Sequence, residues 1–489
     1  MTTPNTCHVA VLGGGVAGLA TALNILDQAE GLGCDLRVTV FEADDAPGGN
    51  LRTLHQEGWQ LEWGPNGFLD SEPATLRLVE RLGLGERLVP SSDATRHRFL
   101  LVGGRLKEIP TSPGAFLKSG MMPLGAKLRM AGELFKPARR DLGRAAEDPA
   151  TDETIYEFGC RRLGREFAEV MLDPMVKGVF GGDARRLSLA AAFPRMVELE
   201  KDHGGLFRAM IALARKRKKG NKTDAGPSGT LTSFQGGMAD LVEALAQAIN
   251  ASGRAEVRCG SPVETVTREQ DTWRVSGPGF NVGPFTAVVE AAPAHAAALH
   301  LRNAAPETAA ELEKIPFAPM AVVALGFEQK AVGHDLNGFG LLVPTREKRD
   351  ILGCLWTSSI FPGRAPEGKV LLRAMLGGAA NPGVMDLDDD SLATLTLGEL
   401  RPLLGLKGSP AMIRIIRHRR AIAQYLPGHL ALLRRVEKNL ERLEGLFLTG
   451  SSYRGIAVNA CVKEAEAVGG SVVQYLKEKR GAQSAEARS

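Results

Sequence analysis

Residues 9–26 read VAVLGGGVAGLATALNIL, a stretch of eighteen residues without a charged side chain. A helix that spans a membrane needs about 20 mostly apolar residues, but each of the four glycines in this stretch would weaken a helix by about 1 kcal/mol relative to alanine. The pattern instead predicts a buried strand over residues 7–12, a glycine turn, and a buried helix over residues 16–29, as in the interior of an α/β protein.

The turn has the form Gly13-x-Gly15-x-x-Gly18. Glycines at this spacing allow a tight turn, a close approach of backbone N–H groups to a pyrophosphate, and close packing of helix on strand. A second strand is expected over residues 37–41, and it ends at Glu42, where an acid can accept hydrogen bonds from a ribose diol. The order of strand, turn, helix, strand and acid predicts a dinucleotide site, with a plain glycine turn as the alternative.

The composition indicates a globular protein with more than one folding unit. A chain of 489 residues is too long to fold around a single hydrophobic core. Its content of 44% hydrophobic and 24% charged residues is ordinary for a globular protein. The net charge of +4 does not favour nucleic acid as a partner. Six scattered cysteines without a C-x-x-C pair predict reduced thiols, with neither a disulfide framework nor a metal site. The amino terminus lacks the basic region of a secretory signal.

The residues after Glu42 narrow the choice of dinucleotide. They read ADDAPGGNLRT at 43–53, with a second glycine pair, and WGPNGF follows at 63–68. This layout resembles the FAD-dependent amine-oxidase-like superfamily, in which the second pair backs the flavin's phosphates; two surface turns are the alternative. Near the other end, GLFLTG at 445–450 predicts a strand, and a helix is expected over residues 460–478. The resemblance implies that this segment returns to the FAD domain. The sequence contains one Gly-x-Gly-x-x-Gly fingerprint, so we expect no separate NADPH site. The electrons of the reduced flavin are therefore expected to pass to oxygen or to a quinone.

Further stretches resemble the protoporphyrinogen oxidase family, in the same order and along nearly the whole chain. They are GPNGF (64–68), RFLL (98–101), DPMVKGVFGGD (173–183), GFGLLVP (338–344), FPGRAP (361–366) and YRGIAVNAC (453–461). Some positions depart from the family pattern: Gly67 stands where serine is usual, His418 where tryptophan is frequent, and Ala423 where proline is frequent.

The resemblance implies a set of residues that bind the cofactor. They are Gly13, Gly14, Gly15, Val16, Ala17, Gly18, Glu42, Ala43, Gly49, Asn50, Arg52, Gly64, Pro65, Asn66, Gly67, Val263, His418, Ile456, Ala457 and Val458. Within this set, Val263 is expected on the adenine side, and His418 near the flavin ring.

Four residues are expected at the substrate by the same resemblance. Arg98 would grip a propionate through two parallel N–H···O bonds; on the pattern alone it is a surface side chain. Leu342 and Phe361 would lie on either side of the tetrapyrrole. Without the resemblance, both would be predicted to be residues of the hydrophobic core. Gly178 would bring backbone near the substrate, and otherwise breaks a helix. No ionisable catalytic residue is expected, because the flavin takes the hydride itself.

The activity implied is oxygen-dependent, six-electron oxidation of protoporphyrinogen IX to protoporphyrin IX in haem biosynthesis, with FAD as cofactor. Oxidation of coproporphyrinogen III to coproporphyrin III, a different flavin amine oxidase or desaturase, and a non-catalytic FAD-bound scaffold are the alternatives. The implied partners are the porphyrinogen, molecular oxygen, a membrane surface, ferrochelatase and a second copy in a homodimer. The implied location is cytoplasmic, peripheral to the inner membrane.

The expected fold class is α/β, with a discontinuous Rossmann-like FAD-binding domain, a mixed-sheet substrate domain and a helical insert. The FAD domain would comprise residues 1–93, 211–298 and 431–489, the membrane-binding insert 94–210, and the substrate domain 299–430. Residues 112–136 mix apolar and basic side chains, which suits a membrane surface; an ordinary solvated cap is the alternative. The basic run RKRKKGNK at 215–222 opens a polar stretch to about Thr230, which predicts a mobile basic loop that contacts anionic lipid; a nuclear signal is the alternative.

Overall fold

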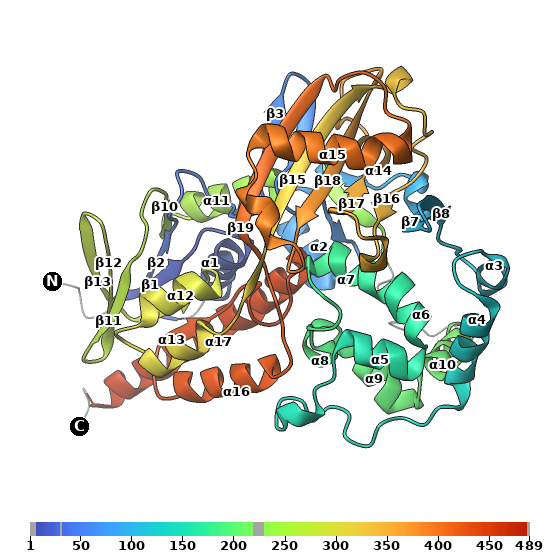
Figure 1. The fold of residues 1–489 in the computed structure, drawn as a ribbon. Helices are drawn as coiled ribbons and strands as arrows, with labels where there is room; N and C mark the ends of the chain where they lie inside the picture. Colours follow the sequence, from blue (N-terminus) through green and yellow to red (C-terminus); the bar gives the residue numbers. More distant parts are fainter. Residues whose placement is uncertain (1–5, 30–31, 219–228, 487–489) are drawn as a thin grey trace.

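Five parallel strands form the sheet of the cofactor lobe in the computed structural model, which describes residues 6–29, 32–218 and 229–486 (Figure 1). Their order is β10 (Ala255–Arg258), β2 (Asp35–Phe41), β1 (Thr6–Leu12), β14 (Ala287–Glu290) and β20 (Leu446–Leu448). The strands come from both ends and the middle of the chain, so segments far apart in sequence build one sheet. The predicted first strand and the strand that ends before Glu42 are confirmed.

Helices and a second small sheet cover the two faces of this parallel sheet. One face carries α1 (Val16–Gln28), α2 (Pro73–Arg81), α11 (Ala239–Ala251) and α17 (Val458–Glu486). The other carries the antiparallel strands β11 (Thr265–Glu269), β12 (Thr272–Gly277) and β13 (Phe280–Phe285), with α12 (Ala294–Leu301), α13 (Pro306–Leu312) and α16 (His429–Leu440). The helix α1 is apolar on most sides because it is buried between neighbours, as the sequence predicts.

The part of the chain that is expected to bind the substrate, here named the substrate lobe (residues 99–108 and 317–423), is built on a mixed seven-stranded sheet. Its order is β19 (Met412–Ala423), β15 (Phe317–Glu328), β18 (Lys369–Gly377), β17 (Ile351–Leu355), β16 (Gly340–Leu342), β7 (Phe99–Val102) and β8 (Arg105–Glu108). Neighbouring strands are antiparallel except for β16 and β7. Helix α15 (Asp389–Leu404) packs against one face (Figure 1), and Trp59, Leu61 and Trp63 pack against residues of the other face.

The prediction that helices begin at residue 94 is wrong for its first part. Residues 99–108 form β7 and β8, which pair with β16 and so extend the substrate sheet. Between the lobes lie the short ladders β3 (Thr53–Gln56) with β4 (Trp59–Glu62), and β5 (Phe68–Leu69), β9 (Leu231–Phe234) and β6 (Leu88–Pro90). Helix α14 (Thr357–Ile360) follows β17.

The helical insert begins only at residue 113 and runs to residue 218. Its helices are α3 (Pro113–Lys118), α4 (Leu124–Ala131), α5 (Ile155–Arg162), α6 (Arg165–Phe167), α7 (Asp173–Phe180), α8 (Leu189–Ala192), α9 (Pro194–His203) and α10 (Leu206–Lys218). The start of the expected basic loop, residues 215–218, is therefore helical; residues 219–222 lie outside the described residues.

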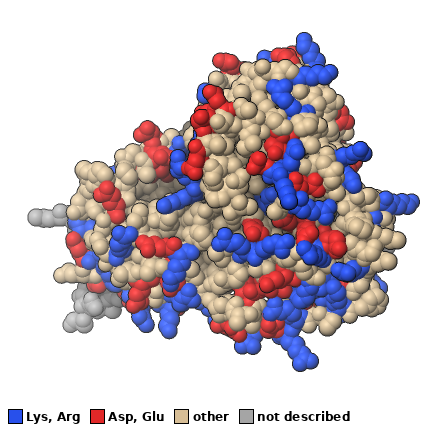
Figure 2. All heavy atoms as spheres, viewed as in Figure 1, with Lys and Arg blue, Asp and Glu red and all other residues tan. Residues whose placement is uncertain are grey.

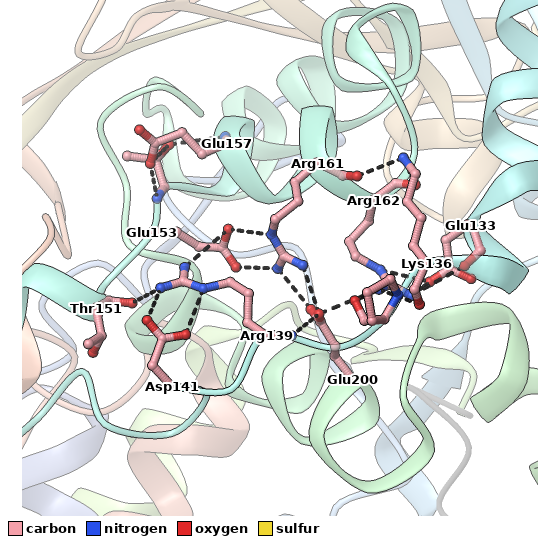
Figure 3. A network of polar contacts seen from close by, with 12 residues as sticks. Glu133, Lys136, Arg139, Asp141, Thr151, Glu153, Glu157, Arg161, Arg162 and Glu200 are labelled. Carbon is pink, nitrogen blue, oxygen red and sulfur yellow. Dashed lines mark hydrogen bonds and ion pairs between the residues drawn. The ribbon is translucent and has the colours of Figure 1, made fainter.

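Part of the interior of the insert consists of ion pairs (Figure 3). Arg162, Glu133 and Glu200 are all 0% exposed. The Arg162 Nε donates to Glu133 at 2.9 Å, and Arg161 donates to Glu200 at 2.7 Å and also to Glu153. Buried charges of this kind persist only when they are paired and hydrogen-bonded.

Candidate active site

The glycine turn between β1 and α1 has the geometry that its spacing predicts. Gly13 lies at φ +109°, a conformation that favours glycine, and its N–H donates to the Phe41 carbonyl at 2.8 Å. A Cβ atom at Gly18 would lie 2.0 Å from the Gly13 carbonyl oxygen, so this position also requires glycine. A Cβ atom at Gly15 would meet no other part of the described chain within 4 Å, so the space beside Gly15 is open.

The first turn of α1 leaves backbone N–H groups available. Gly15 caps the helix without a side-chain hydrogen bond, so the N–H groups of Val16 and Ala17 lack intrahelical acceptors. The positive end of the helix dipole points to the same place. This arrangement favours an anion such as a diphosphate.

The second glycine pair lies against this turn. The Gly48 N–H donates to the Gly14 carbonyl at 2.9 Å, and Gly15 and Gly48 form a parallel bridge. A Cβ atom at Gly49 would lie 3.7 Å from the Gly15 Cα atom, and the exposed Asn50 follows. The two glycine segments of the sequence therefore form one continuous backbone surface.

Glu42 turns its carboxylate back toward the glycine turn. The residue is only 8% exposed; its Oε2 accepts from the Gly14 N–H at 2.8 Å, and its Oε1 accepts a second backbone N–H at 2.9 Å. Each oxygen retains acceptor capacity, which suits ribose hydroxyls. Ala43 is exposed beside it. The Ser261 N–H donates to the Glu42 carbonyl at 2.8 Å, and this brings the segment of Val263 to the same edge.

The residues from Trp63 to Asn66, named here the Trp63–Asn66 loop, lie beside the second glycine pair. The Trp63 N–H donates to the Arg52 carbonyl at 2.9 Å, and the Arg52 guanidinium lies 5.3 Å from the centre of the Trp63 ring. A Cβ atom at Gly64 would lie 2.4 Å from the Asn50 carbonyl oxygen. Only glycine fits this approach, so the loop is held directly against the cofactor cradle.

Two side chains of the substrate lobe hold the same loop from the opposite side. Arg373 on β18 donates to Asn66 Oδ1 at 2.7 Å, to the Trp63 carbonyl at 3.0 Å and to the Gly64 carbonyl at 2.6 Å. His418 on β19 donates through Nε2 to the Trp63 carbonyl at 3.1 Å. Burial lowers the pKa of His418 and the charge of Arg373 lowers it further, against the raising effect of the hydrogen bond to Trp63, which favours the neutral imidazole.

The departure at Gly67 has a structural reason. A Cβ atom there would lie 2.4 Å from the Thr232 carbonyl oxygen on β9. A serine, the usual residue in the family, would require this backbone to shift. Pro65, which precedes Asn66, fixes its own φ and stiffens the approach to this contact.

The carboxyl-terminal segment returns to the cofactor lobe, where buried polar groups hold it. The Tyr425 hydroxyl donates to the Ser451 carbonyl at 2.7 Å and accepts from the Gly455 N–H at 3.0 Å. His429 Nε2 donates to the Tyr453 carbonyl at 2.8 Å. Burial lowers the pKa of His429 to about 4, against the raising effect of that hydrogen bond.

Helix α17 begins at Val458, two residues before the expected start at Ala460, and it continues past residue 478 to Glu486. Ile456 and Ala457 directly precede it. The Asn459 side chain donates to the Leu69 carbonyl at 2.9 Å, which fixes this helix start beside the Trp63–Asn66 loop and its continuation.

The residues of this cradle fit an FAD. The open space at Gly15 and the uncapped start of α1 suit its diphosphate, and Glu42 suits a ribose. Three buried polar atoms have no hydrogen-bond partner among the described residues: Arg52 Nε, Thr449 Oγ1 and the Tyr453 hydroxyl. Buried polar groups are normally paired, so a bound polar group is the expected partner.

An apolar strip crosses the inner face of the substrate sheet next to the Trp63–Asn66 loop. Its members are Met320, Val322, Leu352, Met375 and Ile416, with Leu342 at the far end. Helix α7 lies on this face through its glycines. A Cβ atom at Gly178 would lie 2.7 Å from Leu342, and one at Gly181 would lie 2.8 Å from Met320. The structure thus brings together the expected substrate residues Gly178 and Leu342.

Arg98 lies at the open end of this strip. Its carbonyl accepts from the Ile109 N–H at 2.7 Å and continues the β7–β8 ladder, next to the pair Leu342 and Leu100. The side chain is exposed, and its guanidinium lies 5.4 Å from the centre of the Phe339 ring. No carboxylate of the described residues pairs with it, so its hydrogen-bond donors are available to a ligand.

Phe361 is placed differently from the other expected substrate residues. It is 1% exposed, follows α14, and faces the Arg364 guanidinium at 5.4 Å. Arg364 in turn donates to Ser233 and to the Phe234 carbonyl on β9. In the described residues, Phe361 does not join the apolar cluster that contains Leu342. Its role at the substrate stays a prediction from the resemblance.

Arg373 is the main residue that the sequence analysis missed. The signal was a single charge within the apolar strand sequence VLLRAML at 370–376. A charged side chain on a strand that is buried on both faces requires polar partners. The sequence could not say which partners, because they lie about three hundred positions away in the Trp63–Asn66 loop.

The parallel sheet, the glycine cradle and the apolar face beside it define a flavin-dependent oxidoreductase. The comparison with known families agrees: the chain belongs to the flavin containing amine oxidoreductase family, whose sequence profile matches residues 16–468. The protein is an FAD-dependent oxidase, and the resemblance seen in the sequence is confirmed.

Individual relatives match over almost their whole length. Coproporphyrinogen III oxidase of Bacillus subtilis (strain 168) is 28% identical, over 96% of this chain and 98% of its own. Protoporphyrinogen oxidase 1, chloroplastic, of Arabidopsis thaliana is 30% identical, over 94% of this chain and 87% of its own. A crystal structure from Exiguobacterium sp. 255-15, provisionally described as a protoporphyrinogen oxidase, matches with a TM-score of 0.79 at 25% identity, over 96% of this chain and 99% of that one.

Proposed function

We propose that the protein oxidises protoporphyrinogen IX to protoporphyrin IX with molecular oxygen as electron acceptor, in haem biosynthesis. The observation that carries the proposal is the apolar strip from Met320 to Leu342, which lies beside the Trp63–Asn66 loop and has Gly178 and Gly181 packed against its ends. A flat, mostly apolar macrocycle suits such a face. The names of the full-length relatives support the same substrate class.

In this proposal, the side chains of the protein bind and orient the substrate. When bound, FAD would accept one hydride in each of three two-electron oxidations of the CH2-bridged macrocycle, and three molecules of oxygen would carry the electrons away as hydrogen peroxide. The apolar strip excludes water from the substrate and holds a bridge toward the cofactor. Arg98 grips a propionate from the open end of the strip.

Coproporphyrinogen III is the second candidate substrate, because relatives from Bacillus subtilis and Staphylococcus aureus carry that name. The two candidates differ in carboxylate number, so turnover of both, followed by porphyrin fluorescence, separates them. We expect a higher kcat/KM for protoporphyrinogen than for coproporphyrinogen. A higher kcat/KM for coproporphyrinogen would reverse the assignment, and turnover of neither would refute the proposed function.

The Arg98 assignment has its own test. Arg98→Ala should raise KM for the porphyrinogen at least about tenfold, the usual scale for a lost charge-assisted pair, and leave FAD content unchanged. Arg98→Lys keeps the charge but loses the forked geometry, so its KM should lie between the KM of wild type and that of Arg98→Ala. An unchanged KM in Arg98→Ala would remove this residue from the substrate site.

We extend the proposal to a peripheral position on a membrane surface, on the cytoplasmic side of the inner membrane. Leu117, Leu124, Leu128 and Phe135, here named the apolar patch, are each more than half exposed on the insert. Figure 2 shows basic and acidic side chains interspersed over the insert. Among the described helices, none combines the length and the apolar content needed to cross a bilayer. Ferrochelatase and a homodimeric partner are proposed on the resemblance alone.

A further inference from the structure

Arg373 is a buried cation without a paired anion. It is 6% exposed, and its hydrogen-bond acceptors are the neutral Asn66 amide and the carbonyls of Trp63 and Gly64. Its Nε is buried and has no partner among the described residues. No carboxylate of the described chain lies within ion-pair distance of it; Glu62 acts on it only through space.

Arg162 in the insert shows what full compensation looks like. Its guanidinium meets the carboxylates of Glu133 and Glu200, and Glu200 also pairs with Arg161, so each buried charge there faces an opposite charge. Burial lowers the pKa of Arg373 to about 10, which still leaves it protonated at neutral pH. A buried charge is costly unless an opposite charge or dipole compensates it. The site therefore holds a positive charge whose direct hydrogen-bond partners are all neutral.

His418 reinforces the same arrangement without adding charge. Its neutral imidazole donates to the Trp63 carbonyl, which also accepts from Arg373. Two donors thus fix one carbonyl of the Trp63–Asn66 loop. The position of His418, where tryptophan is frequent in the family, is therefore coupled in space to Arg373.

The stored charge lies beside the cofactor cradle. The Trp63–Asn66 loop that Arg373 holds is the loop that packs against Arg52 and Asn50 of the second glycine pair segment. Only this loop separates the guanidinium from that segment. A flavin gains negative charge when it takes up two electrons, and a nearby cation favours that charge.

We infer that Arg373 is the positive charge that raises the electron affinity of the bound flavin, acting across the Trp63–Asn66 loop. The inference rests on the proposed function, because it requires FAD in the cradle. Arg373 acts on the flavin only through its electrostatic field and does not contact the substrate.

The test uses purified holoenzyme and two readouts that do not depend on turnover. One is the midpoint potential of the bound flavin, and the other is the dissociation constant for sulfite, an anionic probe that adds to oxidised flavin and leaves negative charge on it. Arg373→Gln removes the charge and keeps an amide donor. Asn66→Asp neutralises the guanidinium in place with almost no change of volume, which keeps the test open if Arg373→Gln fails to fold.

Two further variants separate charge from packing. Arg373→Lys keeps the charge, and Arg364→Gln removes a neighbouring buried guanidinium that instead donates to β9. We expect Arg373→Gln and Asn66→Asp to weaken sulfite binding at least tenfold and to lower the potential by about 30 mV or more, the equivalent of tenfold for two electrons. Arg373→Lys and Arg364→Gln should stay within about threefold of wild type, below half of that free-energy change.

Three results would overturn the inference: sulfite affinity within threefold of wild type in both Arg373→Gln and Asn66→Asp, an equal loss in Arg373→Lys, or an equal loss in Arg364→Gln. If wild-type protein binds no FAD, the proposed function fails instead. If wild-type protein binds FAD and oxidises porphyrinogen but the variants have an unchanged flavin potential, the proposed function stands and only the inference about Arg373 fails.

Discussion

The cofactor lobe and the helical insert differ in how part of the interior is filled. In the cofactor lobe, β1, β14 and α1 bury aliphatic side chains such as Val9, Val11 and Leu19 at 0% exposure. In the insert, Arg162 and its carboxylate partners occupy equally buried positions (Figure 3). Apolar packing spreads stability over many contacts, whereas an ion network concentrates it in a few groups that cannot be removed singly.

The largest effect is expected from breaking the insert's network. Arg162→Met leaves Glu133 buried without its partner, so the free energy of unfolding should fall by about 3–5 kcal/mol. Chemical denaturation followed by circular dichroism measures it. The control is Arg302→Met, whose pair with Glu313 is mostly exposed and should contribute at most about 1 kcal/mol. A loss below 1 kcal/mol in Arg162→Met would contradict the contrast between the two regions.

The next effect concerns a polar exception within the cofactor lobe. His429 has a pKa of about 4 when folded, below its ordinary value of 6.5. Between these pH values the unfolded chain binds more protons, so stability should fall as pH drops from 6.5 toward 4, by up to about 3 kcal/mol. His429→Gln cannot titrate but can still donate to Tyr453. Its unfolding free energy should therefore change less over this range, and parallel pH curves for both proteins would refute the prediction.

The glycine turn gives a smaller and more selective effect. Gly15→Ala places a methyl group in open space at an ordinary φ of −74°, so the cofactor-free protein should keep its Tm. The dissociation constant for FAD should nevertheless rise at least about tenfold, or 1.4 kcal/mol, because the methyl group fills the phosphate position. Flavin fluorescence titration measures this.

Gly18→Ala is the matched control for Gly15→Ala. Its Cβ atom meets the Gly13 carbonyl, so it should destabilise the cofactor-free protein itself by about 1–3 kcal/mol or more. Equal FAD affinity in wild type and Gly15→Ala would mean that the diphosphate does not lie at the open space beside Gly15.

The smallest effect is expected at the apolar patch of the insert. Leu128→Ser should weaken binding to vesicles that contain anionic lipid by about three- to tenfold, because one partly inserted leucine is lost. Leu299→Ser, at a similarly exposed leucine on α12, serves as control and should bind as wild type does. Equal vesicle binding by all three proteins would remove the patch from any membrane contact.

The cofactor cradle was predictable because its causes are local. A glycine spacing dictates where Cβ atoms cannot stand, so Gly13, Gly15 and Gly18 predicted the turn, and the residues after Glu42 narrowed the expected ligand to FAD. The extension of the substrate sheet by β7 was not predictable, because its partner β16 lies some two hundred and forty positions away. The buried partners of Arg373 and Arg162 are also tertiary, since nothing in a run of residues shows which distant carbonyl or carboxylate a charge will meet.

Anaerobic reduction shows whether FAD in the glycine cradle accepts electrons from a porphyrinogen held on the neighbouring apolar face. Purified yellow protein is mixed with protoporphyrinogen IX under anaerobic conditions, and the flavin absorbance is followed before oxygen is admitted. We expect the porphyrinogen to bleach the flavin absorbance while oxygen is absent. When oxygen is admitted, the yellow colour should return and porphyrin fluorescence should grow. Folded protein that takes up no FAD, or flavin that stays oxidised with both porphyrinogens, would contradict this expectation.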